Sequence, residues 1–308
     1  MARNIVLLFD GTWNNRKTQT NVIRMRNCIH THGREDPAQP CFYDEGVGTQ
    51  WYNRLSGGAF GRGLSENIQE GYAWLSRTHA PNDAIYVFGF SRGAYTARSL
   101  VGLIRKCGLL NAVSEKSIAE AYALYREKDV HPDHPKAVAF RARHARETRV
   151  RYIGVWDTVG ALGFPISQIP FSRDYYQWHD TELSKIVDYA IHAVAVDEHR
   201  KDFSVTLWGK LKPENVKVEQ RWFAGAHSDV GGGDGGTLPN LALRWLQDMA
   251  ESAGLALKDK VQVGPQDPLG PVTDSFGNFM FGIYRWFKKR HHRAFGERSR
   301  STNRTIAP

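Results

Sequence analysis

Residues 84–104 read as a strand, a sharp turn and a helix in direct succession, and this constrains the fold more than any other feature. The apolar run Ala84 to Phe88 leads into the stretch GFSRGA at 89–94. Apolar residues then recur at helical spacing: Ala94, Ala97, Val101 and Ile104. Glycine on both sides of Ser91 lets two backbone segments approach closely, because no side chain fills the turn. The stretch fits Gly-x-Ser-x-Gly, the turn that exposes a serine hydroxyl at the end of a strand.

Ser91 has two readings at this stage. A serine between a strand and a helix can simply cap the helix, and the five-residue pattern alone arises by accident in roughly one chain in ten of this length. A nucleophilic serine needs an imidazole to take its proton and a carboxylate to orient that imidazole. The functional reading therefore requires an acid and a histidine at other strand ends.

Short apolar runs separated by helical patterns predict an α/β fold with a mostly parallel sheet and helices on both faces. The strand-like runs are Asn4 to Phe9, Cys41 to Tyr43, Ala84 to Phe90, Val150 to Trp156 and Val216 to Ala224. The helical patterns are 63–81, 94–107, 115–128, 136–147, 181–196 and 239–253. We expect one domain over residues 1–290 and a basic tail over 291–308. Residues 111–148 hold one helix more than a crossover needs, so they form a candidate helical insertion or lid.

The candidate partners of Ser91 follow it in the order acid, then histidine. Asp157 closes the strand 150–156, and His227 closes the strand that ends at Ala226. The carboxyl ends of parallel strands gather catalytic groups at one edge of a sheet. Asp197 and Asp229 remain open as alternative acids.

A serine nucleophile also needs amide donors for the oxyanion. The residue after the nucleophile normally gives the first, which is Arg92 here. The loop after the first strand begins at Asp10, and Gly11 or Thr12 is the candidate for the second donor.

Other site chemistry is also open. Asp10, Asp157 and Asp229 all follow strands and could hold a hard cation, as in a metal-dependent phosphohydrolase. Gly57, Gly58, Gly61 and Gly63 form a glycine-rich loop that could cradle phosphate, but it lacks the Lys-Ser/Thr of a P-loop.

Charge is concentrated at the end of the chain. The formal net charge is +9, and residues 281–308 contain eight lysine and arginine residues against the single acid Glu297. Such a stretch can meet an anionic membrane surface, and nucleic acid is the less favoured partner. A non-catalytic binding module that docks through this stretch is the second function class. The three cysteines show no CxxC spacing and no signal peptide or membrane span is apparent, so we expect a cytoplasmic protein.

Six blocks in order resemble the type VI secretion phospholipase effectors and their α/β-hydrolase relatives in bacteria and fungi. They are LFDGTWNN at 8–15, YDEGVGT at 43–49, GFSRGAYTARSLVGLIRKCGLL at 89–110, GVWDTVGALG at 154–163, HAVAVDEHRKDF at 192–203 and WFAGAHSDVGGG at 222–233. The resemblance implies an α/β-hydrolase-like fold and a Ser-His-Asp hydrolase of carboxylic esters, with Ser91 as nucleophile and His227 as base. It does not assign the acid, which rests on strand position.

The expected substrate is a phospholipid or a soluble acyl ester, and no cofactor is expected. Residues 111–148 and the aromatic stretch at 276–287 are candidates for an acyl pocket, with plain core packing as the simpler reading. The resemblance also allows delivery by a dedicated secretion system. Oligomeric state stays open.

Overall fold

A seven-stranded parallel sheet forms the centre of the computed structural model, which describes residues 2–11, 18–29, 38–46, 57–159, 183–209, 211–233, 235–278 and 305–306. The strand order is β2-β1-β3-β6-β7-β8-β9. The strands are β1 (Asn4–Phe9), β2 (Cys41–Asp44), β3 (Ala84–Phe90), β6 (Val150–Trp156), β7 (Val187–Ala195), β8 (Lys217–Phe223) and β9 (Thr305–Ile306). Every neighbouring pair is parallel, as predicted.

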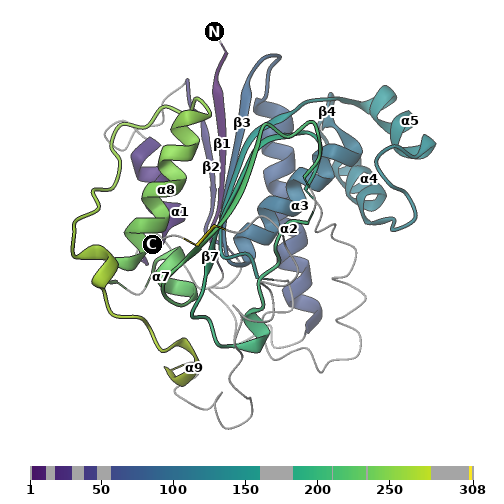
Figure 1. Ribbon diagram of the computed structural model, residues 1–308. Coiled ribbons are helices and arrows are strands. Elements are labelled where there is room, and N and C mark those ends of the chain that lie inside the picture. The colour runs from purple at the N-terminus through teal and green to yellow at the C-terminus, as the bar shows by residue number, and fades with distance from the viewer. Residues whose placement is uncertain are drawn as a thin grey trace.

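Helices cover both faces of the sheet (Figure 1). They are α1 (Asn21–Ile29), α2 (Gly57–Thr78), α3 (Arg92–Cys107), α4 (Glu115–Arg126), α5 (Pro135–His144), α7 (His227–Gly231), α8 (Leu238–Ser252) and α9 (Ser275–Asn278). Side chains of β1 alternate between two cores: Ile5 and Leu7 pack with α2 and α3, whereas Val6 and Leu8 pack with α1 and α8. Burial on both faces explains why β1 is apolar throughout. The α/β-hydrolase-like class is therefore confirmed.

The helix predicted over 181–196 is wrong, because that segment contains β7. Six successive residues of β7 are buried, from Ala190 to Ala195. A strand buried on both faces loses its polar alternation, and a short apolar run of this kind cannot be told from a buried helix by periodicity. Pairing with β6 and β8 decides the outcome.

Two further expectations about helices need correction. The glycine-rich loop at 57–63 does not exist, since α2 already begins at Gly57 and includes all four glycines. Beyond the first turn a helical backbone engages its own amides, so those of Gly61 and Gly63 are not free to bind phosphate as the predicted loop required. Helix α1 was missed, although Val22, Met25 and Ile29 lie at helical spacing and are buried.

The insertion is helical, but its described contacts lie away from Ser91. Lys106, near the end of α3, donates hydrogen bonds to the carbonyls of Tyr125 and Glu127, and Arg141 of α5 donates one to the carbonyl of Lys106. Ser91 precedes the opposite end of α3, about 24 Å away for sixteen helical residues. In Figure 1, α4 and α5 lie near the end of the sheet where the strands begin. The structure does not place a lid over Ser91 at 111–148.

A close approach between α3 and β1 fixes the first turn of α3. A Cβ on Gly93 would lie 2.1 Å from the carbonyl oxygen of Phe9 and 2.5 Å from that of Asp10. We expect Gly93→Ala to lower the free energy of unfolding by about 3 kcal/mol, the upper range for overpacking, because backbone cannot move aside as a side chain can. Urea denaturation measures this loss. Gly209→Ala is the control, since a Cβ there meets nothing within 4 Å, and an equal loss in both variants would contradict the expectation.

None of the described helices is both long enough and apolar enough to cross a bilayer. The basic stretch 281–308 lies outside the described residues except for Thr305 and Ile306, and so does most of the aromatic stretch at 276–287.

Candidate active site

Ser91 occupies the sharp turn between β3 and α3. Its backbone has φ 59° and ψ −120°, a left-handed conformation that a non-glycine residue adopts only under constraint. A Cβ on Gly89 would lie 2.4 Å from the carbonyl oxygen of Gly93, so the glycines on either side of Ser91 are needed for the tight crossing. The side chain of Ser91 makes no capping hydrogen bond to α3. Ser91 is therefore the N-cap residue of α3 by position, as the alternative interpretation expected, but its hydroxyl does not cap the helix.

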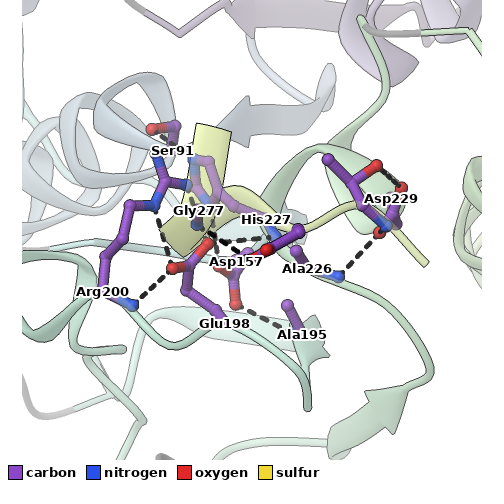
Figure 2. A network of polar contacts seen from close by, with 11 residues as sticks. Ser91, Asp157, Ala195, Glu198, Arg200, Ala226, His227, Asp229 and Gly277 are labelled. Carbon is purple, nitrogen blue, oxygen red and sulfur yellow. Dashed lines mark hydrogen bonds and ion pairs between the residues drawn. The ribbon is translucent and has the colours of Figure 1, made fainter. Parts of the chain in front are cut away.

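His227 links Ser91 to Asp157 through both ring nitrogens (Figure 2). Its Nε2 lies 2.8 Å from Ser91 Oγ, and its Nδ1 lies 2.6 Å from Asp157 Oδ2. Asp157 follows β6 with a φ of 40° and accepts a second hydrogen bond, from the amide of Ala195 at 2.9 Å, on Oδ1. The acid is wholly buried, while Ser91 and His227 are 6% and 7% exposed. The three strand ends thus meet at one edge of the sheet.

The surroundings of His227 favour the neutral ring. Burial lowers the pKa of His227, and although the hydrogen bond and charge of Asp157 raise it, the net shift is downward. The ring packs against Phe90 and Phe203, whose ring centroids lie 4.6 and 5.2 Å away. A neutral imidazole that donates from Nδ1 to Asp157 presents the Nε2 lone pair to the hydroxyl of Ser91. This is the arrangement of a general base.

The pH dependence of any reaction that uses His227 as a base follows from this shift. We expect the acidic limb of kcat/KM to have its midpoint below pH 6.5, the ordinary pKa of histidine. The midpoint shifts to lower pH because a general base must be unprotonated, and a lowered pKa keeps His227 unprotonated at lower pH. A kcat/KM profile between pH 4 and 9 measures the midpoint, and a midpoint above pH 7 would contradict the expectation.

The two alternative acids have other partners. Asp197 Oδ2 accepts a hydrogen bond from the amide of Gly225 at 2.8 Å. Asp229 accepts from the amides of Ala226 and Thr273 and from the hydroxyl of Thr273. Of the three candidate acids, only Asp157 has a recorded hydrogen bond with the ring of His227.

The residues predicted for the oxyanion have mixed outcomes. Arg92 is the first residue of α3. The amides of the first helical turn have no acceptor within the helix, so the amide of Arg92 stays a candidate donor to the oxyanion. The amide of Gly11 donates instead to Asp10 Oδ1 at 2.8 Å, which argues against Gly11 as the second donor. Asp10 Oδ2 accepts from the hydroxyls of Thr20 and Tyr43, so this carboxylate organises the loop rather than facing a substrate. Thr12 lies outside the described residues.

The carboxylates proposed for a cation do not converge. Within the part of the chain that the structure describes, no group of three or more His, Cys, Asp and Glu side chains has the spacing to hold a metal ion. Asp10, Asp157 and Asp229 each bind different protein donors instead.

Residues of the insertion line a cavity of about 670 Å³ between α3 and the start of β7, among them Tyr125 and Val130. None of Ser91, Asp157 and His227 lines it. The structure therefore gives no support to an acyl pocket formed by 111–148 beside the serine.

Glu198, Arg200 and Phe203 lie in the block at 192–203 but had no predicted role. Glu198 and Arg200 form a buried ion pair at 2.7 Å beside His227 (Figure 2). A buried charge next to a buried histidine is a signal that only the folded chain reveals, because polar residues after a strand are expected to be exposed.

Comparison with protein families gives one matching description over residues 3–249: type VI secretion, phospholipase effector Tle1-like, catalytic domain. Among curated proteins, the uncharacterized protein YEL023C of Saccharomyces cerevisiae is 29% identical over 228 residues, which are 66% of this chain and 32% of that protein. The chain thus spans about a third of the length of this relative.

Among solved structures, an uncharacterized protein from Pseudomonas aeruginosa is 18% identical, with a TM-score of 0.47, and the match covers 94% of this chain and 51% of that one. A thermophilic esterase from Thermogutta terrifontis is 14% identical, with a TM-score of 0.45, and the match covers 84% and 86% of the two chains.

Proposed function

We propose a serine ester hydrolase, from the premise that the chain belongs to the family of Tle1-like phospholipase effector catalytic domains of type VI secretion. The description of that family as phospholipase effectors supports ester hydrolysis as the coarse activity. The finer assignment rests on one observation: an unbroken hydrogen-bonded series from Ser91 through His227 to Asp157, with distances of 2.8 and 2.6 Å.

In the proposed reaction, Ser91 Oγ attacks the acyl carbonyl while His227 Nε2 takes the hydroxyl proton. The carbonyl oxygen becomes an oxyanion, for which the amide of Arg92 is the proposed donor. The tetrahedral intermediate collapses, the C–O bond to the alcohol breaks, and His227 returns the proton to the leaving alkoxide. Water then attacks the acyl-serine by the same route and releases the carboxylic acid. Asp157 holds the tautomer and stabilises the imidazolium in both halves.

The proposed substrate is a phospholipid acyl ester. A panel of p-nitrophenyl esters tests the ester chemistry, and release of fatty acid from phosphatidylglycerol and phosphatidylcholine vesicles tests the lipid assignment. We expect turnover of both kinds of substrate. Turnover of the soluble esters alone would replace the lipid assignment with a soluble acyl ester, and turnover of neither would contradict the proposal.

An anionic membrane surface is the proposed partner of the basic stretch 281–308. Electrostatic attraction predicts that the protein co-sediments with vesicles that contain anionic lipid. The bound fraction should fall as the salt concentration rises, because salt shortens the Debye length. Binding to neutral vesicles to the same extent would contradict an electrostatic contact.

A metal-dependent phosphohydrolase predicts a different result in the same assays. Its turnover of phosphodiesters would be lost with EDTA and would survive Ser91→Ala. We expect ester turnover to be unchanged by EDTA, since neither the nucleophile nor the base in the proposed mechanism is metal-bound.

A further inference from the structure

The segment that follows β7 is hydrogen-bonded to the segment between β8 and α7, the helix that begins at His227. The amide of Val196 donates to the carbonyl of Phe223, and the amide of Asp197 donates to that of Gly225. The carboxylate of Asp197 accepts the amide of Gly225 in return, at 2.8 Å. Gly225 has a φ of 103°, so this bond holds a turn that favours glycine two residues before His227.

Glu198 continues the contact to His227 itself. Its carboxylate is 3.4 Å from the backbone amide of His227, and its side chain is fully buried. Arg200 holds the same carboxylate through Nε at 2.9 Å, through an Nη at 2.7 Å and through its own amide at 2.7 Å. Burial would raise the pKa of Glu198, but the hydrogen bonds and charge of Arg200 outweigh it, so the carboxylate stays ionised.

Arg200 also reaches the imidazole through an aromatic ring. Its guanidinium carbon lies 3.6 Å from the centroid of Phe203. Phe203 in turn packs edge-on against the His227 ring, which also contacts Phe90. The backbone and the ring of His227 are thus both braced by one short segment, residues 197–203.

We propose that Glu198 and Arg200 are positioning residues for His227, and that together they fix its orientation and balance the charge around its ring. The inference rests on the proposed function, because it assigns a purpose to the base of that reaction. Glu198 contacts the backbone amide of His227 and Arg200 contacts Phe203, which packs on its ring, so the proposed effect is exerted through His227.

A second Glu-x-Arg pair in the same chain provides a matched control. Glu219 and Arg221 lie two residues apart on β8 and form an ion pair at 2.6 Å. Arg221 also lies over an aromatic ring, that of Trp245, at 4.7 Å. This pair has the same chemistry and spacing as Glu198 and Arg200, but no recorded contact with His227.

A role in charge balance predicts a change in the pH profile that a purely structural role of Glu198 and Arg200 would not produce. Among the described residues, the charged and acidic groups that act on His227 are Asp157, Glu198 and Arg200. Glu198→Gln leaves the cation of Arg200 uncompensated and should lower the pKa of His227 further. Arg200→Met leaves the Glu198 carboxylate uncompensated and should raise it. The two variants should therefore shift the acidic limb of the pH profile in opposite directions, and the double variant should fall between them.

The experiment compares Glu198→Gln, Arg200→Met, Arg200→Lys and the double variant with Glu219→Gln and Arg221→Met. Each variant is checked by circular dichroism, and its ester turnover and rate of fluorophosphonate labelling are measured across pH. We expect kcat of the Arg200→Met variant to fall about 100-fold with KM little changed, as for a misplaced catalytic group. Arg200→Lys keeps the positive charge. Its acidic limb should have the wild-type midpoint, and its kcat should lie between those of Arg200→Met and the wild type. The Glu219 and Arg221 variants should stay within about 2-fold, as surface substitutions usually do.

NMR titration of the His227 imidazole gives the same comparison without any substrate. Opposite shifts of this titration in Glu198→Gln and Arg200→Met support the proposal even where turnover is absent, in which case the proposed function alone fails. Shifts of the same sign, or effects no larger than in the Glu219 and Arg221 variants, overturn it.

Discussion

Replacing Ser91 by alanine should abolish both ester turnover and covalent labelling by a fluorophosphonate probe. The hydroxyl that lies 2.8 Å from His227 Nε2 is the proposed attacking group. Without it, only water bound in the site can attack, and the loss of a triad nucleophile costs on the order of 10⁶-fold in kcat. Loss of the β-hydroxyl leaves the fold intact, since Ser91 Oγ does not cap α3.

A buried serine elsewhere on the same helix separates the chemistry from packing. Ser99 is 3% exposed and lies two turns along α3 from the first residue of that helix. Ser99→Ala should retain labelling and turnover within about 5-fold, the effect of a modest change in packing. The assignment of Ser91 as nucleophile would be contradicted if the fluorophosphonate did not label the wild-type protein, or if it still labelled Ser91→Ala.

Asp157→Asn should produce the second large loss, about 10⁴-fold in kcat, the typical cost of reversing the histidine tautomer in a triad. The asparagine oxygen can still accept the amide of Ala195, as Asp157 Oδ1 does. Its NH₂ group then faces His227 Nδ1 and can only donate there. The imidazole must place its own proton on Nε2, toward Ser91, where it can no longer accept one.

Asp229→Asn separates this effect from a general loss of a buried carboxylate. Asp229 is 5% exposed and has three recorded protein donors, but no recorded contact with the His227 ring. We expect turnover to fall less than about 10-fold, because a weakened hydrogen bond to the backbone amide of Ala226 perturbs local packing rather than the tautomer of His227. Steady-state kinetics and thermal melts on both variants measure the difference. Equal losses in the two would show that Asp157 acts only through stability.

The local sequence pattern predicted those strands whose own residues are enough to distinguish a strand from a helix. The strands around Val6, Val87 and Ile153 combine apolar runs with clear boundaries, and each forms where expected. Segment 187–195 carries the same kind of residues but was assigned to a helix, because a strand covered on both faces has no polar alternation. Its place between β6 and β8 is information that the segment itself does not contain.

The candidate site divides in the same way. The sequence by itself determined the turn at Ser91, since two glycines and a flanking strand and helix permit little else, and it placed Asp157 and His227 at strand ends. Only the tertiary structure showed that Asp157, rather than Asp197 or Asp229, is hydrogen-bonded to the ring of His227, and only it brought Glu198 and Arg200 beside the imidazole. His227 is 136 residues from Ser91 and 70 from Asp157 along the chain, so their meeting depends on the order and register of parallel strands. That order is set by packing of the whole sheet, which no local stretch of sequence specifies.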